Sequence, residues 1–429
     1  MASWRNWAGS VRVSPRQLLK PESVSEIQEI VRGMPRGGRI RMTGSGHSFT
    51  PIAVSRDVLM RPSHFGEGVG IDSDRRVARV PAGMRLSDVN DHLAAAGFAL
   101  ANMGDITAQT MAGSISTSTH GTGLGFTGLA GQVVGFGLVS ANGDHMECSA
   151  TEHPEVWRFG RVGLGALGIL TYVDMRIVPA FRLHAVEEPR RLSEVLSNFD
   201  RTVSSVDHFE FYWIPHTKWA LTKTNIRTQE EARPRPRAQK WWNKTVMENY
   251  AFGAVCATGR LIPALIPRLA TALPSSGRQE FVEASHDVFA TRRLVKFHEM
   301  EYSIPRQHLV AAFGQLVDAV DRSGLKVSFP VEVRVTGPDD VPLSTSYGRE
   351  SAYIAVHMYK GMPYEGYFRM VEEILSPFEG RPHWGKIHFQ SAETLRSRYE
   401  LFDAFRELRS QLDPNGIFLN DHLERVLGV

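Results

Sequence analysis

The stretch that decides the fold reads MAGSISTSTHGTG over residues 111–123. It lies inside a longer tract, Gly104 to Gly125, which is the densest run of small residues in the chain. Glycines leave backbone N–H groups unhindered and the Ser and Thr hydroxyls add donors, so the tract suits a backbone wrapped around a polyanionic or polyhydroxyl ligand. An ordinary surface loop is the alternative, and we favour ligand binding.

A second glycine-rich loop, Thr43-Gly44-Ser45-Gly46-His47-Ser48, follows a predicted short strand at 39–42. Before that strand, a capping box at residues 23–26 opens an amphipathic helix that ends near Gly33. A strand followed by a glycine loop lets the backbone approach a ligand closely. The other elements expected in the first third are a strand, a helix and a hairpin turning at Asn142-Gly143, at 77–80, 86–96 and 133–150. This third is therefore mixed α+β.

Residues 163–168 read GLGALG and match the G-x-G-x-x-G pattern of dinucleotide-binding folds. That pattern needs a strand before the glycines and a helix after them. Here residues 154–162 have a helical pattern and residues 169–178 a β-branched strand pattern, so the order is reversed. We therefore reject a Rossmann fingerprint and interpret the glycines as close packing between a helix and a strand.

The composition excludes several classes of protein. The chain has 429 residues, 42% of them hydrophobic and 22% charged, which is typical of a globular protein of two or three domains. A net charge of +3 argues against a nucleic-acid partner. Two cysteines, Cys148 and Cys256, form no C-x-x-C pair and fit a reducing compartment. The N-terminus has no signal-peptide pattern, so we expect a cytoplasmic protein.

The sequence texture changes near residue 179, where charged residues begin to alternate with aromatic strands such as 208–213. This change predicts a second domain. The apolar stretch 250–274 contains two arginines and three prolines, which favours a helix pair or a surface segment over a membrane span. The basic and aromatic run from Arg233 to Trp242 is interpreted as a solvated loop. A non-enzymatic protein that binds lipid or nucleic acid through this run is the competing hypothesis.

Three pieces of the second half place polar side chains among apolar ones, at 330–334, 353–359 and 383–386. Glu332 and Arg334 lie two apart on a predicted strand and so share a face. If the pieces meet, Glu332, Arg334, His357 and Lys386 together could deprotonate an alcohol and stabilise an anion. An exposed ion pair is the alternative for Glu332 and Arg334 alone. No metal site is expected, because the histidines show no metal-binding spacing.

Together these segments resemble the aldonolactone oxidoreductases of the vanillyl-alcohol-oxidase flavoprotein superfamily, which include L-gulono-1,4-lactone oxidases, D-arabinono-1,4-lactone oxidases and, further off, alditol oxidases. The matching motifs run almost end to end, at residues 6–9, 44–48, 117–123, 163–168, 332–334, 382–386 and 412–420. The resemblance implies an α+β fold of the two-domain VAO/PCMH type. It implies an FAD-binding domain at 1–178, a cap domain with a large antiparallel sheet at 179–377, and a C-terminal segment at 378–429 that returns to the flavin.

The resemblance also implies FAD as the cofactor, with its pyrophosphate held by backbone N–H groups of residues 43–48 and 113–120. His47 stands where covalent members attach the flavin 8α-methyl group to a histidine; a histidine merely packed beside the flavin is the alternative. The other expected cofactor-binding residues are Thr43, Gly44, Ser45, Gly46, Ser48, Asp105, Thr110, Gly113, Thr117, Ser118, Thr119, His120 and Ile169.

The reaction implied is oxidation of a secondary alcohol carbon of a sugar-acid 1,4-lactone, with hydride transfer to flavin N5. By resemblance, Glu332 is the acid/base or hydroxyl-orienting group, Arg334 the substrate clamp, Lys386 the cation near flavin N1, and His357 a pocket residue. Gly104 leaves a path open for O₂, which predicts an oxidase that forms H₂O₂; a turn that needs positive φ is the alternative reason for this glycine.

Other activities stay open at this stage. An alditol oxidase acting on a polyol is one alternative to the lactone enzyme. A dehydrogenase that passes electrons to a quinone or cytochrome is another. Any membrane contact is expected to be peripheral, because the sequence contains no unbroken apolar span.

Overall fold

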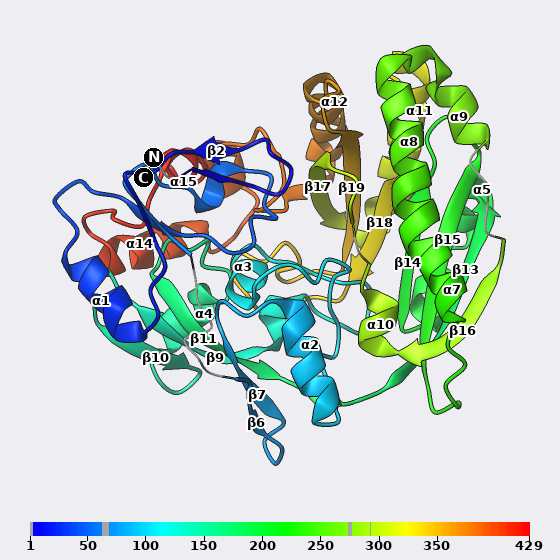
Figure 1. Ribbon diagram of the computed structural model, residues 1–429. Helices are drawn as coiled ribbons and strands as arrows, with labels where there is room; N and C mark the ends of the chain where they lie inside the picture. Colours follow the sequence, from blue (N-terminus) through cyan, green and yellow to red (C-terminus); the bar gives the residue numbers. More distant parts are fainter. Residues whose placement is uncertain (1–2, 62–67, 273–276, 292) are drawn as a thin grey trace.

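The computed structural model describes residues 3–61, 68–272, 277–291 and 293–429. Figure 1 shows two lobes joined side by side, the first built from the N-terminal third together with the C-terminal helices and the second, the cap lobe, built from the middle of the chain. The two chain ends lie close together on the first lobe.

Two main sheets form the first lobe. Within the described residues, a parallel sheet has the order β3-β5-β4 and an antiparallel sheet the order β10-β9-β11-β7-β6. The strands of these sheets are β3 Gln17–Leu19, β4 Ile40–Met42, β5 Val58–Met60, β6 Gly70–Asp72, β7 Val77–Pro81, β9 Val133–Val139, β10 His145–Ser149 and β11 Ile169–Arg176. Short pairs form between β1 Trp4–Arg5 and β2 Arg12–Val13, and between β8 Phe98–Ala99 and β12 Val178–Pro179.

The elements predicted locally in this lobe are confirmed. Helix α1 (Val24–Arg32) is capped by Ser23, whose side chain accepts from the Glu26 N–H, and ends at Gly33. The Glu26 carboxylate accepts from the N–H of Glu22 rather than of Ser23, so the capping box is shifted by one residue. Helix α2 (Leu86–Ala95) and the β9–β10 hairpin stand where predicted.

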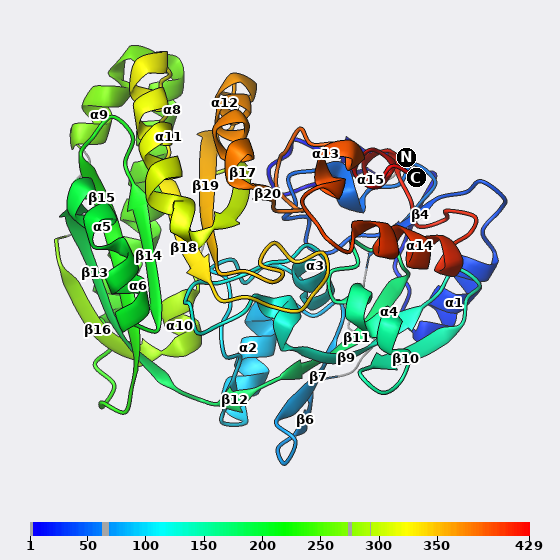
Figure 2. The same ribbon diagram turned by 180° about the vertical axis from the view of Figure 1, so that it is seen from behind.

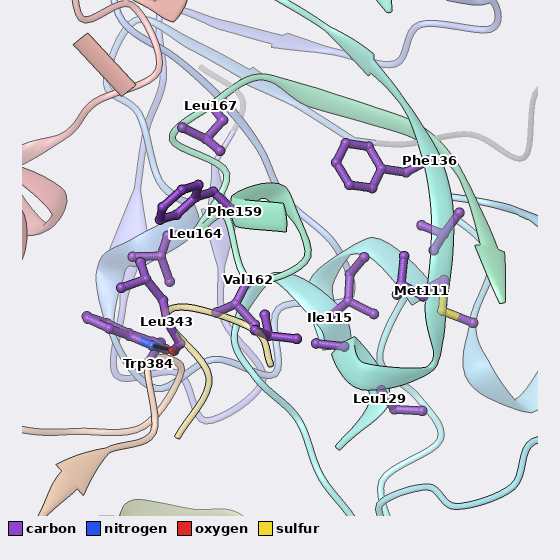
Figure 3. Close-up of a cluster of buried hydrophobic side chains, with 14 of the residues drawn as sticks. Met111, Ile115, Leu129, Phe136, Phe159, Val162, Leu164, Leu167, Leu343 and Trp384 are labelled. Carbon is purple, nitrogen blue, oxygen red and sulfur yellow. Dashed lines mark hydrogen bonds between the residues drawn. The ribbon is translucent and has the colours of Figure 1, made fainter. Parts of the chain in front are cut away.

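The tract around residues 111–123 contains a short helix that the sequence did not predict. Helix α3 (Met111–Ser116) is capped by Thr110, whose hydroxyl accepts from the Gly113 N–H. Figure 3 shows why the helix forms, because Met111 and Ile115 point into the core of the first lobe beside Phe136 and Val162. The tract is therefore part of the core packing rather than a surface loop.

The glycine-rich stretch 163–168 lies between helix α4 (Pro154–Gly160) and strand β11, in the predicted reverse of the Rossmann order. A Cβ at Gly163 would lie 3.2 Å from the Gly160 carbonyl oxygen at the end of α4, and a Cβ at Gly168 would lie 2.6 Å from the Val139 carbonyl oxygen on β9, so these glycines allow close packing against both a helix end and a strand. The buried Arg41 guanidinium donates to the carbonyls of Gly165, Leu164 and Phe418. This side chain ties the glycine stretch to the C-terminal tail.

The cap lobe is one antiparallel sheet of eight strands in the described residues, with the order β16-β13-β15-β14-β18-β19-β17-β20. Figure 2 shows α5, α6 and α11 over one face, while α7 and α8 lie over the opposite face in Figure 1. The strands are β13 Arg182–Arg191, β14 His208–Trp213, β15 Trp219–Thr228, β16 Gln279–Ala284, β17 Phe297–Pro305, β18 Val331–Thr336, β19 Ser351–Tyr359 and β20 Arg381–Pro382.

Helices of the cap lobe and the C-terminal part complete the fold. Those of the cap are α5 Leu192–Ser197, α6 Phe199–Ser205, α7 Arg237–Trp241, a π-helix at Trp242–Ala251, α8 Phe252–Leu261, α9 Ile266–Ala272, α10 Ser285–Phe289, α11 Leu309–Ser323 and α12 Glu365–Leu375. Helices α8 and α9 form the predicted pair within 250–274. Among the described residues, no helix is both long and apolar enough to cross a membrane.

The C-terminal helices pack in the core of the first lobe. They are α13 Ala392–Arg396, α14 Phe402–Leu412 and α15 Asp421–Leu427. Asn420 caps α15 and donates to the carbonyls of Pro51, Ile52 and Val54. Trp384, labelled in Figure 3, donates its indole N–H to the Leu343 carbonyl at 2.8 Å. The predicted domain boundaries at 178 and 377 stay predictions.

The run from Arg233 to Trp242 is largely exposed, as expected of a solvated segment, although it ends in helix α7. Arg235 is the exception, because its side chain is buried 3.1 Å from Glu283 on β16 and its guanidinium covers the Phe281 ring. The sequence pattern did not identify this burial, because the carboxylate that neutralises Arg235 stands 48 residues further along the chain.

Candidate active site

Two cavities lie next to each other near the junction of the lobes. The first, called the groove below, lies in the first lobe between the 43–48 loop, α3 and the glycine stretch. The second, called the chamber, is lined by residues of both lobes. His47 and Gln109 line both cavities, so a ligand in the groove can reach into the chamber at these two residues.

The loop that lines the groove presents free backbone donors. Thr43 N–H donates to Met60 and Phe49 N–H to Gly385, but the five N–H groups of residues 44–48 between them have no acceptor in the part of the chain that is described. A Cβ at Gly44 would lie 2.4 Å from the Thr110 hydroxyl oxygen, so only glycine fits there. Consecutive free N–H groups in a concave loop suit a bound anion such as a pyrophosphate.

The Asn6-Trp7 motif holds this loop in shape. Trp7 N–H donates to the Gly46 carbonyl at 2.7 Å, and the Asn6 side-chain amide donates to the Ser48 carbonyl at 3.0 Å. The Trp7 ring stacks on the His47 ring at 5.5 Å between centroids. Burial, the Lys386 cation and Arg85 outweigh Glu299 and lower the pKa of His47 to about 4, so its imidazole is neutral.

Most of the predicted cofactor residues line the groove: Thr43, Gly44, Ser45, Gly46, His47, Ser48, Thr110, Gly113, Thr117 and Ile169. Thr119, His120, Asp105 and Gly104 line the chamber instead. Ser118 lines neither cavity, and its hydroxyl lies 3.2 Å from that of Thr345.

The expectation that backbone N–H groups of 113–120 cradle a pyrophosphate is revised. The N–H of Gly113 donates to the Thr110 hydroxyl, that of Ser118 to Ile115, and that of Thr119 to Ser114. These N–H groups therefore donate to oxygen atoms of helix α3 and its N-cap residue rather than to the groove. The N–H groups without an acceptor in the described part of the chain belong to the 44–48 loop, and α3 lines the groove with Ala112, Gly113 and Ser116.

Strand alternation explains the chemistry of the chamber. On β18, Val331, Val333 and Val335 pack into the cap core while Glu332 and Arg334 point to the opposite face. The same alternation brings Tyr212 of β14, His357 of β19, and Glu299 and Glu301 of β17 to that face. The three pieces predicted to meet therefore do meet, and the exposed ion pair is excluded because Glu332 and Arg334 are both buried.

Arg334 is the centre of a buried charge cluster. Its guanidinium lies 2.5 Å from Glu332, 2.8 Å from Glu210 and 3.2 Å from Asp105. Asp105 also lies 3.1 Å from Arg293, so it belongs to this cluster rather than to the groove. Burial raises the pKa of Asp105, but Arg334 and Arg293 outweigh it and keep that carboxyl ionised.

Glu332 differs from the other carboxyls of the cluster. Burial raises its pKa, Arg334 lowers it, and the neighbouring carboxylates of Asp105 and Glu210 raise it again, so the net shift is upward. The Tyr212 hydroxyl donates to Glu332 at 2.6 Å. A carboxyl with a raised pKa that lines a cavity is suited to proton transfer.

A second cluster surrounds Lys386. Its Nζ lies 2.5 Å from Glu299, which in turn lies 3.5 Å from His357 Nε2. Close by, His120 Nε2 lies 2.9 Å from Glu301 and its Nδ1 lies 2.9 Å from the Gly121 carbonyl. Both ring nitrogens of His120 therefore face oxygen atoms.

Sequence reasoning missed several residues of the chamber: Glu210, Tyr212, Lys223, Arg293, Glu299 and Glu301. The spacing rule that identified Glu332 and Arg334 also applies to Glu299 and Glu301, which are two apart on β17. Gly104 has a negative φ, so a turn with positive φ does not explain it. A Cβ at Gly104 would lie 3.0 Å from the His120 carbonyl oxygen.

Comparison with known proteins gives consistent matches along the chain. Residues 173–426 match the family described as D-arabinono-1,4-lactone oxidase, and residues 15–149 match the family described as FAD binding domain. The chain is 40% identical to an L-gulono-1,4-lactone dehydrogenase of Mycobacterium tuberculosis, with 99% of both sequences aligned. It is 35% identical to an L-gulonolactone oxidase of Scyliorhinus torazame, covering 99% of this chain and 98% of that protein.

The fold is also found among solved structures. Cholesterol oxidase from B. sterolicum superimposes with a TM-score of 0.83 at 16% identity, covering 99% of this chain and 96% of that chain. At 16% identity, the similarity shows that the two chains share a fold and indicates nothing about a shared function. The predicted α+β fold of the VAO/PCMH type, with a large antiparallel cap sheet, is confirmed.

Proposed function

The chain belongs to the D-arabinono-1,4-lactone oxidase family, and on that premise we propose that it oxidises a sugar-acid 1,4-lactone of the L-gulono or D-arabinono type with FAD. The observation that carries this proposal is the charged face of the cap sheet, where Glu332, Arg334 and Lys386 line a chamber that adjoins a groove with free N–H donors. FAD supplies the two-electron oxidising chemistry when bound.

The residues of the groove fit FAD. The N–H groups of residues 44–48, which have no acceptor among the described residues, suit its pyrophosphate, and Gly44 allows their loop to lie directly against Thr110. His47, at the junction of groove and chamber, is neutral and therefore has a lone pair available on its ring. We infer from this that His47 carries the covalent link to the flavin.

The chain's own residues handle the substrate proton. Glu332, with its raised pKa, accepts the proton of the lactone hydroxyl that is oxidised. Arg334 is held by three carboxylates and cannot swing away, so it fixes the geometry of Glu332 and of a substrate oxygen placed beside it. Lys386 supplies a cation at the side of the chamber nearest His47.

The electron acceptor proposed is O₂, with H₂O₂ as product. Gly104 lines the chamber, and a methyl group there would press on the His120 carbonyl at 3.0 Å, so the glycine keeps this wall of the chamber open. The relatives named above include both a dehydrogenase and an oxidase. The competing proposal is a dehydrogenase that reduces a quinone or a cytochrome.

A substrate panel tests the proposed reaction. Steady-state kcat/KM is measured for L-gulono-1,4-lactone, D-arabinono-1,4-lactone and xylitol, with O₂ and an artificial acceptor side by side. We expect one of the lactones to be the best substrate, and Glu332→Gln to lose turnover while Glu283→Gln, a buried carboxylate outside the chamber, keeps it. Xylitol as the best substrate would contradict the proposal and favour an alditol oxidase.

A further inference from the structure

Glu299 is a buried carboxylate on β17 that contacts two of the proposed catalytic side chains at once. Its Oε1 lies 2.5 Å from Lys386 Nζ and 3.5 Å from His357 Nε2. Lys386 belongs to the loop after β20 and His357 to β19, so the three side chains come from separate segments. One carboxylate oxygen therefore joins two parts of the chamber wall.

The backbone around Lys386 is fixed without the Glu299 side chain. Ile387 N–H donates to the Glu299 carbonyl at 2.9 Å, and His383 N–H donates to the Glu301 carbonyl at 3.0 Å. These bonds fix the position of the loop but leave the four-carbon side chain of Lys386 free to rotate. The Lys386 ammonium also lies 5.3 Å from the centre of the Phe49 ring, but its short ionic contact with the Glu299 carboxylate, at 2.5 Å, is the one that draws it toward β17.

His357 also contacts the Glu299 carboxylate. Its Nδ1 lies 3.1 Å from the Pro330 carbonyl, and its Nε2 lies 3.5 Å from the Glu299 carboxylate. The ring is therefore held between the Pro330 carbonyl on one side and Glu299 on the other.

We propose that Glu299 is a positioning residue, which holds the Lys386 ammonium charged and aimed into the chamber and orients the His357 ring beside it. This role rests on the proposed lactone oxidation, in which both side chains face the reacting substrate. Glu299 lines the chamber, and the role proposed for it is exerted through Lys386 and His357.

The charge of Lys386 depends on all the groups that face it. These are Glu299 and Glu301 from β17, His357 from β19, Asp105 and His47 from the first lobe, and His383 from its own loop. Burial lowers the pKa of Lys386, but Glu299, followed by Glu301 and Asp105, raises it above its ordinary value. Burial lowers the pKa of His47 to about 4 and of His383 to about 3, so these rings are neutral neighbours.

The test measures the ionisation of Lys386 directly. FAD-loaded wild type, Glu299→Gln and Glu299→Asp are labelled with trace acetic anhydride over a pH series, and the acetylation of Lys386 is followed by mass spectrometry. In Glu299→Gln the pH of half-labelling should fall by about one unit or more, a tenfold or greater change in the uncharged fraction. Glu299→Asp keeps the charge and should restore most of the wild-type value.

The matched control is Glu283→Gln. Glu283 is a buried carboxylate of the same sheet, 3.1 Å from Arg235 and 3.3 Å from Lys240, and it does not line the chamber. This variant should leave both the labelling of Lys386 and the pH profile of kcat unchanged. In Glu299→Gln, by contrast, the alkaline limb of the pH profile of kcat should shift to lower pH by the same amount as the pH of half-labelling of Lys386.

Two results overturn the proposal. One is an unchanged half-labelling pH of Lys386 in Glu299→Gln. The other is a loss of turnover in that variant without any movement of either pH profile, which is the result a purely structural role would give. A wild-type enzyme that oxidises no lactone would refute the proposed function instead, and the labelling experiment would still decide the role of Glu299.

Discussion

Replacing Arg334 with Met removes a guanidinium that three buried carboxylates share, while keeping an unbranched side chain of similar reach. Asp105 would keep its contact with Arg293 at 3.1 Å, and Glu210 would keep Lys223 at 3.4 Å. Glu332 would keep only the hydroxyl of Tyr212. Of the three carboxylates, Glu332 is therefore the one that has no cation in contact with it in the variant.

The expected cost follows from burial. Removing one partner of a buried ion pair destabilises a protein by about 3–5 kcal/mol, whereas an exposed pair contributes about 0–1 kcal/mol. The Arg79–Asp174 pair, in which the Arg79 side chain is 51% exposed, provides the comparison. We expect Arg334→Met to lower the free energy of unfolding by about 3 kcal/mol or more at neutral pH, and Arg79→Met by about 1 kcal/mol at most.

The loss of unfolding free energy in Arg334→Met should grow as the pH rises. The pKa of Glu332 is already raised by burial against the effect of Arg334, and loss of Arg334 raises it further. A carboxyl whose folded-state pKa exceeds its unfolded value contributes stability that is fully present below the unfolded pKa and is lost as the pH rises through the folded pKa. In the wild type, Arg334 lowers the pKa values of Asp105 and Glu210, which stabilises the folded protein above the unfolded pKa values of these carboxyls. The variant loses this contribution in the same pH range.

The assay is urea unfolding followed by tryptophan fluorescence at about pH 5 and about pH 8, for wild type, Arg334→Met and Arg79→Met. A loss in Arg334→Met no larger than that in Arg79→Met would refute the reasoning. So would a deficit that is the same at both pH values, because the three carboxylates would then not be the cause.

Three further predictions concern the proposed chemistry. Lys386→Met should lower kcat by about 10²-fold in steady-state assays, because it removes a preorganised cation, while Lys240→Met outside the chamber should not. Acid precipitation should leave the yellow flavin in the protein pellet, and His47→Ala should release it to the supernatant. Gly104→Ala should slow reoxidation by O₂ in stopped-flow measurements while leaving reduction by the lactone largely intact; equal slowing of both half-reactions would contradict the assigned oxygen path.

The sequence correctly predicted the elements that are determined by residues close together along the chain. The Ser23 cap, the Asn142-Gly143 hairpin and the reversed helix–strand order around residues 163–168 are all found in the structure. The alternation that places Glu332 and Arg334 on one face is also local. Helix α3 was missed because Gly and Ser disfavour a helix, and here the burial of Met111 and Ile115 overrides that preference.

The partners of the site residues depend on contacts between distant strands. Glu210 meets Arg334 because β14 pairs with β18, across 124 residues, and the pattern of neither strand specifies that pairing. Arg235 meets Glu283 in the same way, so the pattern of its largely exposed run did not show that this one arginine is buried. A sequence pattern fixes which face a side chain occupies, while the register between strands decides which charge it meets.

Anaerobic mixing of the flavin-loaded enzyme with substrate tests whether a lactone reduces the flavin. We expect L-gulono-1,4-lactone or D-arabinono-1,4-lactone to bleach the visible flavin absorbance in a single turnover, with Glu332→Gln reacting much more slowly than wild type. Absorbance that persists with both lactones, or that xylitol bleaches faster than either, would contradict this expectation.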